Sequence, residues 1–194
     1  KNCTWKRKID DFIDVSWFGA IGDGINDDSN AISRANIAAH NECLPLKFIP
    51  GHIYQVKKTY EIDVSKTSWF SSDLSTLKWF NDFNADYAIR LFSSQKDYSK
   101  RFQNVKVAIK SIAIIGAGIK NLLDSCAIKI GGDERNSSLF TIDSVSIQGW
   151  RTTLAFDNNS WRIKFCDCHF LWGNIIAPPG NKNSGECMVF DNCM

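Results

Sequence analysis

The sequence predicts an all-β solenoid, a right-handed parallel β-helix with a short N-terminal capping helix. Three observations predict this fold: paired short strands that recur in the second half, a further strand between the copies, and a glycine-rich loop that leads into one small helix. Within the strands the apolar residues alternate with a period of two. A repeat built from helices is excluded because its apolar period would be 3.6.

The repeat begins at Val107 and returns at Phe140, Ile163 and Met188. Each copy has two alternating apolar residues, two turn-like residues and a second alternating pair, the last copy being shorter. Successive later copies start about 23 to 25 residues apart, which suits one coil of a solenoid. Two such short strands cannot bury their inner face alone, but stacked copies bury it as one continuous core.

A third strand recurs between these units, and its copies are Tyr87–Phe92, Cys126–Gly131, Thr153–Asn158 and, more loosely, Asn174–Pro179. Three strands per coil fit a parallel β-helix. A β-sandwich is the competing fold, but it needs hairpin turns such as Asn-Gly or Asp-Gly between its strands. Those dipeptides do not separate these strands.

The stretch from Ser16 to His40 predicts a cap for the open end of the solenoid, where core and strand edges would otherwise be exposed. Gly22 and Gly24 allow a sharp turn, and Asp27 or Asp28 is the expected N-cap of a helix over about 29–41. One face of that helix is small and apolar: Ala31, Ile32, Ala35, Ala38 and Ala39. A phosphate-binding loop is disfavoured because no Gly-Lys-Ser/Thr follows the glycines.

Composition limits the function classes. The 194 residues carry 23 Lys and Arg against 21 Asp and Glu, which leaves no basic surface for nucleic acid. No apolar run approaches the roughly 20 residues that span a bilayer, so membrane insertion is not expected. The seven cysteines and three histidines lack zinc-site spacing. We expect no metal, no cofactor and free, mostly buried thiols in a chain made in a reducing cytoplasm.

The segment "WFGAIGDGINDDSNAISRANIAA" followed by "LKFIPGHIYQV" resembles the entry segment of the pectate-lyase-like superfamily, and the likeness spans Val15 to Val56. The later coils extend it, and within the superfamily they resemble bacteriophage tailspikes and capsule depolymerases. The resemblance implies a homotrimeric virion tail protein, made in the host cytoplasm, that binds and when complete depolymerises a capsule or O-antigen polysaccharide. A non-catalytic tail adhesin or structural segment is the alternative. A secreted pectinase is less favoured, because its Asn-Thr-Asp and Gly-Asp-Asp motifs are missing.

Glycosidases use two carboxylates and lyases use a base, so outward-facing charged residues are the catalytic candidates, Asp133 and Glu134 after a Gly-Gly pair among them. We predict Asp157, Glu186 and Asp167 as catalytic, although corner positions also favour Asp for structural reasons. The resemblance transfers no catalytic residue, because tailspike carboxylates have no fixed local motif. Hydrolase and lyase both remain open.

Three tryptophans near the ends of successive coils, Trp150, Trp161 and Trp172, form the predicted substrate-binding set. An exposed row of indoles would let sugar rings stack on it. The alternative interpretation is that they pack the flanking loops.

The expected organisation is a linker or neck over residues 1–14, following another domain, and the N-terminal part of a β-helix domain over 15–194. The last repeat stops at Met194 before its final apolar position. We therefore expect further coils after residue 194 in the native gene product.

Overall fold

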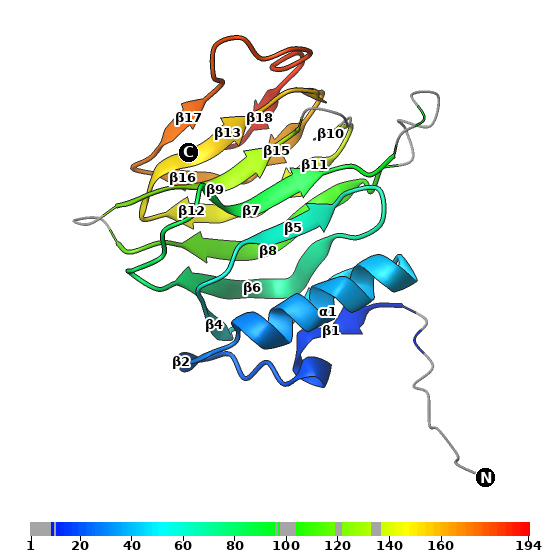
Figure 1. The fold of residues 1–194 in the computed structure, drawn as a ribbon, viewed down its shortest axis with the longest axis vertical. Helices are drawn as coiled ribbons and strands as arrows, with labels where there is room; N and C mark the ends of the chain where they lie inside the picture. Colours follow the sequence, from blue (N-terminus) through cyan, green and yellow to red (C-terminus); the bar gives the residue numbers. More distant parts are fainter. Residues whose placement is uncertain (1–8, 10, 96, 98–103, 119–121, 133–136) are drawn as a thin grey trace.

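The computed structural model describes residues 9, 11–95, 97, 104–118, 122–132 and 137–194. It is a right-handed parallel β-helix, and the strands pair in parallel throughout the described residues. The coils stack from the N-terminal end, at the bottom of Figure 1, to the C-terminal end at the top. In the part of the chain that is described, no helix is long and apolar enough to cross a membrane.

The elements follow one another as short strands with a single α-helix near the start. In chain order they are β1 (Ile13–Asp14), η1 (Val15–Phe18), β2 (Asp23–Asp27), α1 (Ser29–Glu42), β3 (Leu46–Phe48), β4 (Ile53–Val56), β5 (Tyr60–Asp63), β6 (Trp69–Trp79), β7 (Tyr87–Phe92), β8 (Val107–Ile115), β9 (Leu123–Ile130), β10 (Ser137–Ser138), β11 (Thr141–Asp143), β12 (Ser146–Gln148), β13 (Trp150–Phe156), β14 (Ser160–Trp161), β15 (Lys164–Cys166), β16 (His169–Leu171), β17 (Asn174–Ile176) and β18 (Val189–Asp191).

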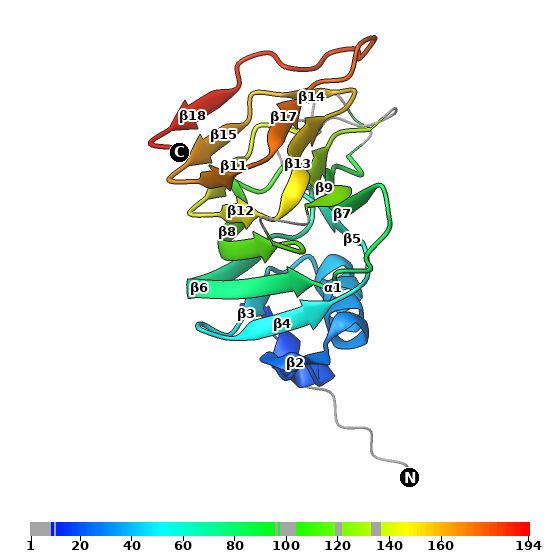
Figure 2. The ribbon, with the colours of Figure 1, turned by 90° about the vertical axis from the view of Figure 1, so that its left-hand side faces the viewer.

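The strands form two main sheets that face each other across the core (Figure 2). An 11-stranded sheet runs along β1-β3-β6-β8-β11-β15-β18, with β2, β4, β12 and β16 beside this path. A 5-stranded sheet has the order β17-β13-β9-β7-β5, and β10 pairs with β14. The first strand begins at Ile13, two residues before the boundary expected at Val15.

The interior is built from ladders of residues in register on successive coils. One ladder runs Ile13, Leu46, Trp69, Ile109, Ile142, Phe165 and Phe190. Its members are fully buried except Phe190 in the last coil, which is 43% exposed. The expected stacking of the repeat is thus confirmed, and in the adjoining β8–β12–β16 ladder Ile114, Ile147 and Phe170 are in register.

The two-residue corners of the repeat turn through left-handed backbone. Ser111, Ser144, Asp167 and Asn192 occupy the second corner position with φ of 54°, 55°, 52° and 52°. Short polar side chains tolerate this conformation better than most, which is why the sequence places Ser, Asp and Asn there. Stacked backbone bonds join neighbouring corners, as from Ser144 N to Cys166 O at 2.9 Å.

Helix α1 lies across the N-terminal end of the solenoid (Figure 1). Ala31, Ile32, Ala35 and Ala39 are buried on its inner face, as predicted. The Asp27 carboxylate accepts from the Ser29 amide at the start of the helix at 2.9 Å, as expected, whereas Asp28 holds the N-cap position without a side-chain capping bond. Its carboxylate instead accepts from the Ile21 and Gly22 amides at 2.7 and 3.0 Å, because the glycine turn brings those amides back over it.

Candidate functional site

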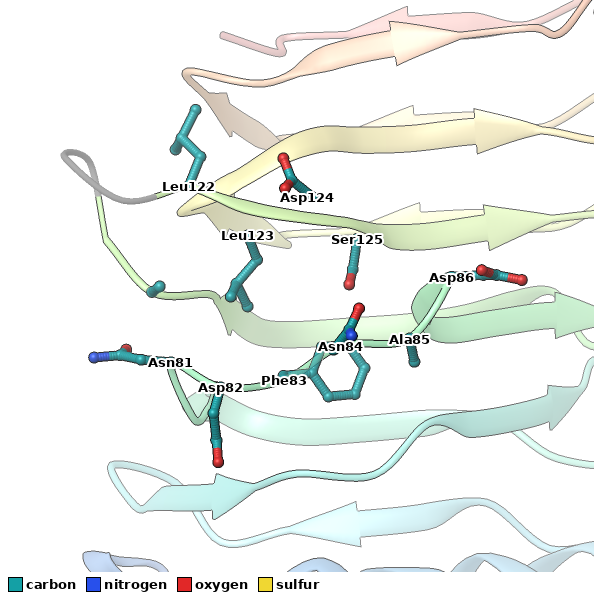
Figure 3. Close-up of a pocket in the computed structure, with 11 residues that line it drawn as sticks. Asn81, Asp82, Phe83, Asn84, Ala85, Asp86, Leu122, Leu123, Asp124 and Ser125 are labelled. Carbon is teal, nitrogen blue, oxygen red and sulfur yellow. The ribbon is translucent and has the colours of Figure 1, made fainter.

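A hollow lies where the 11-stranded sheet gives way to the 5-stranded sheet. The segment 81–86 between β6 and β7 lines one side, and Ala117 with residues 122–125 of the next coil lines the other. The hollow has a volume of about 920 Å³ and is open to solvent (Figure 3). We call it the groove.

The floor of the groove is apolar. Phe83 and Leu123 are only 8% and 6% exposed. The Phe83 ring packs edge-on against Trp79 and Trp150, with centroid separations of 6.2 and 6.0 Å. The two indoles contact each other at 5.5 Å. This aromatic cluster fixes Phe83, since a ring held by two others has little freedom to move.

Two neutral polar side chains face each other above this floor. Figure 3 shows Asn84 and Ser125 pointing toward one another from neighbouring coils. Ser125 is only 7% exposed, and neither side chain has a hydrogen-bond partner among the described residues. Among the described residues, the fully buried hydroxyls without a partner are those of Ser75, Ser137 and Ser138, so the Ser125 hydroxyl is accessible from the groove. Both groups are therefore free to bond to a ligand in the groove.

Three carboxylates stand at the rim, with their charged ends turned out of the groove. Asp82 points toward the preceding coil, Asp124 toward the following one, and Asp86 away from both (Figure 3). Asp124 pairs with Arg151 of β13 at 2.5 Å. Asp82 and Asp86 form no ion pair with any described residue. The groove therefore combines an apolar floor, neutral polar walls and an acidic rim.

A second hollow of about 510 Å³ continues the groove toward the N-terminal end. It shares residues 82–85 with the first and adds Lys57, Lys58 and Thr59. Lys57 pairs with Asp27 at 2.7 Å, and Lys58 donates to the side chain of Asn30 at 2.6 Å. Together the two hollows cross successive coils along the direction in which the coils stack. Adjacent coils are roughly 4.8 Å apart, so this course suits an extended ligand.

The first predicted catalytic residue, Asp157, lies at the end of β13 beside the outer face of the 5-stranded sheet. Lys129 contacts it at 3.1 Å, and the Asn158 amide donates to it at 2.8 Å. Burial by itself would raise the pKa of Asp157, but the Asn158 amide and the Lys129 ammonium outweigh it and hold the pKa below its usual range. The side chain is thus an ionised partner of Lys129.

Among the described residues, no hydrogen bond or ion pair joins Asp157, Asp167 and Glu186 to one another. Asp167 sits at the corner between β15 and β16 and accepts from the Asn192 side chain at 2.5 Å. Glu186 is exposed, and its backbone carbonyl accepts from Arg162 at 2.8 Å. Their catalytic roles stay predictions.

The three predicted tryptophans do not form one exposed row. Trp150 is fully buried under the groove, so the expectation that it stacks on a sugar is corrected. Trp161 is half-buried with the Arg162 guanidinium 5.8 Å from its ring centroid. Trp172 is 59% exposed and has a φ of 57°, which is rare for a bulky residue. Only Trp172 presents a largely open ring.

Sequence reasoning missed the groove residues Phe83, Asn84 and Ser125. The available signal was the polar segment "NDFNAD", which interrupts two apolar strands with a single aromatic residue. Asp133 and Glu134, also outward candidates by sequence, lie outside the described residues. Within the described ranges, no group of three His, Cys, Asp or Glu side chains is placed to hold a metal ion.

The described cysteines are all free thiols, but fewer are buried than expected. Cys126 and Cys168 are buried, Cys166 and Cys193 are half-buried, and Cys43 and Cys187 are exposed, while Cys3 lies outside the described residues. Burial raises the pKa of Cys126 and of Cys168 to about 12, so neither thiol is a nucleophile near neutral pH.

No family model matches the chain. It is 99% identical over all 194 residues to a Klebsiella pneumoniae protein described as "Uncharacterized 65.4 kDa protein in cps region". The chain spans about a third (34%) of the length of that relative.

Several solved structures have the same fold. The enzymatically active domain of tailspike protein 4 of bacteriophage CBA120 matches with a TM-score of 0.79 and 21% identity, over 97% of this chain and 26% of that one. The A-module of the mannuronan C-5 epimerase AlgE6 of Azotobacter vinelandii gives 0.61 and 16%, over 94% and 49%. An iota-carrageenase in complex with iota-carrageenan fragments gives 0.51 and 16%, over 100% and 53%. At these identities the likeness is one of fold, and it places this chain among right-handed parallel β-helix proteins.

Proposed function

We propose that the protein is of the tailspike type and binds a bacterial surface polysaccharide, a capsule or an O-antigen, along the groove. The observation that carries this proposal is that the side chains of Ser125 and Asn84, which have no hydrogen-bond partner among the described residues, face each other above the Phe83 floor. Sugar residues present hydroxyls around an apolar ring face. A site with few polar groups over an aromatic surface matches both features.

The comparisons support the same class of ligand. The tailspike domain, the mannuronan epimerase and the iota-carrageenase all have this fold, and the names of the last two enzymes refer to polysaccharides. The 99% identical relative is described as lying in a cps region. A homotrimeric assembly in a virion tail belongs to the proposal and rests on the tailspike resemblance.

Cleavage of the bound polysaccharide by the longer protein is the second part of the proposal. Hydrolysis would need two carboxyl groups roughly 5 to 9.5 Å apart across the glycosidic bond, whereas a lyase would need a base beside an acidic sugar. The rim residues Asp82, Asp86 and Asp124 lie nearer the groove than Asp157, Asp167 or Glu186. They point outward, however, and Asp124 is held by Arg151.

A non-catalytic adhesin is the second candidate function. It is favoured by the ion pairs that occupy two of the acidic side chains, Asp124 with Arg151 and Asp157 with Lys129. An adhesin would keep the groove and its ligand and would release no product.

Two assays separate these candidates. Binding to a panel of purified capsular and O-antigen polysaccharides should fall roughly five- to tenfold in Ser125→Ala and in Asn84→Ala, since each loses a hydrogen bond of about 1–1.4 kcal/mol to the sugar. Ser72→Ala and Asn41→Ala, at exposed positions away from the groove, are the matched controls. Unchanged affinity in both groove variants would refute the proposed site.

The second assay follows product formation by the 65.4 kDa relative, which contains this segment. New reducing ends without ultraviolet absorbance would indicate a hydrolase, and unsaturated-uronate absorbance would indicate a lyase. Tight binding with neither signal would favour the adhesin. Alanine at Asp157, Glu186 and Asp167 then tests the predicted catalytic roles, and full activity in all three variants would reject them.

A further inference from the structure

The charges around the groove indicate which kind of sugar binds there, if the groove is the polysaccharide site of the proposed function. We infer that the sugar residue bound between Asn84 and Ser125 is uncharged, and that the rim rejects a uronate or another anionic sugar at this position. In the described lining of the groove, the polar groups that face inward are neutral, and no Lys or Arg is present.

The rim has an excess of negative charge. Among the described residues, only Asp124 of the three carboxylates forms an ion pair, with Arg151, and Asp82 interacts more weakly with Lys57. Asp82 and Asp86 are exposed and have no ion-pair partner among the described residues. Charges near a protein surface act on one another at distances up to the Debye length, about 8–10 Å at moderate salt. A sugar carboxylate placed over Phe83 would therefore be repelled by both Asp82 and Asp86.

The nearby lysines do not reverse this balance. Lys57 is neutralised by Asp27 and also lies close enough to Asp82 for that carboxylate to raise the pKa of Lys57, after the larger effect of Asp27. Lys58 belongs to the second hollow and donates to Asn30. A cation that could hold a sugar carboxylate at Ser125 is therefore missing from the described lining of the groove.

The test uses capsular polysaccharides purified from Klebsiella pneumoniae strains, each in its native form and after chemical reduction of its uronate carboxyl groups to alcohols. For the wild-type protein, we expect the carboxyl-reduced form to bind at least as tightly as the native form. Binding of the native form should strengthen severalfold as salt is raised from low to moderate concentration, because salt screens the repulsion. Binding of the reduced form should not change with salt.

The variants sharpen the test. The native polysaccharide should bind the double variant Asp82→Asn/Asp86→Asn roughly threefold more tightly than it binds the wild-type protein, and that binding should no longer depend on salt. Binding of the carboxyl-reduced polysaccharide should be the same for both proteins. Asp73→Asn, an exposed carboxylate on β6 outside the groove, is the control and should change neither.

The outcomes distinguish this inference from the proposed function. A loss of tenfold or more on carboxyl reduction, with native binding still sensitive to Ser125→Ala, would overturn the uncharged-sugar assignment and leave the groove as the binding site. Absence of binding to both forms, or binding indifferent to Ser125→Ala, would overturn the proposed site and this inference with it.

Discussion

The indole Nε1 of Trp69 donates a hydrogen bond of 2.9 Å to the side-chain oxygen of Asn36, and this bond joins the capping helix to the core of the solenoid. The Asn36 amide nitrogen in turn donates to the backbone carbonyl of Glu61 at 2.8 Å. Asn36 is only 7% exposed. One buried side chain of α1 thus satisfies groups on β6 and β5.

Replacing Asn36 by Ala should destabilise the protein by roughly 2 kcal/mol, because the Trp69 N–H and the Glu61 carbonyl both lose their partner. For a chain of this size we expect the Tm to fall by roughly 4–8 °C. Thermal unfolding followed by circular dichroism measures the change. Asn41→Ala, on the exposed side of the same helix, is the control and should stay near wild type. Equal Tm values for the two variants would contradict a stabilising role for the Asn36 hydrogen bonds between α1 and the solenoid.

The turn before α1 depends on Gly22. Its φ is +66°, and a Cβ added there would lie 2.8 Å from atoms of both His52 and Tyr54. Gly22→Ala should therefore lower the free energy of unfolding by at least about 2 kcal/mol. Gly19→Ala is a matched control, with φ of +88° but open space around the added carbon, and should lower it by about 1 kcal/mol. Urea unfolding of both variants measures the difference, and a larger loss at Gly19 would contradict this steric argument.

Stability should depend on pH through His40. Its Nε2 accepts a hydrogen bond of 3.0 Å from the backbone N–H of Asp63, which only the neutral ring can do. Burial, and to a smaller extent Lys66, lower the pKa of His40 below its usual 6.5, although Asp63 and Glu61 act in the opposite direction.

The unfolded chain then binds a proton at His40 more readily than the folded chain, so stability falls as pH drops below about 6.5. The wild-type Tm should decline between about pH 6.5 and 5. His40→Gln should lose this dependence, whereas His169→Gln, an exposed histidine, should keep it. The lowered pKa of Asp63 acts only in a separate window, below its usual 3.8. A wild-type pH profile identical to that of His40→Gln would refute the assignment.

The fold could be predicted because the coils from Val107 onward repeat a period-two pattern with a fixed corner. In the coils before Val107 this pattern is less regular. Strand β6 runs through the corner position without stopping, and its register with β8 shifts between Phe70 and Ser75. An inserted bulge of this kind breaks the alternation on which the sequence argument depends.

The candidate site was less predictable, as Trp150 illustrates. Gly149 has a φ of +82° and turns the chain so that Trp150 faces inward. In the next coil the order is reversed: Trp172 takes the left-handed conformation, with Gly173 after it. By sequence spacing the two tryptophans are equivalent. The different backbone conformations direct the Trp150 side chain into the core and the Trp172 side chain to the surface. The groove itself depends on side chains from two coils that are about 40 residues apart in the chain, Asn84 and Ser125, and no local pattern links them.

We propose that further coils cover the C-terminal end of this segment. The described surface there is apolar: Ile175, Ile176, Val189, Phe190 and Met194 are all more than 40% exposed. The Phe190 ring stacks on Phe165 at 4.7 Å but has no coil above it. A chain extended beyond residue 194 in the manner of the longer relative should be monodisperse at concentrations where 1–194 self-associates, as measured by light scattering. Identical behaviour of the two chains would contradict the proposal.

The position of a bound oligosaccharide in a crystal structure tests the central claim most directly. Crystals would be grown with a fragment of the polysaccharide that binds most tightly in the panel. We predict a sugar ring over Phe83, with hydroxyls within hydrogen-bond distance of the Ser125 Oγ and of the Asn84 side chain, and with the chain continuing toward Lys57 and Lys58. Density for the fragment elsewhere, for instance over Trp172 or beside Asp157, with an empty groove, would contradict the account.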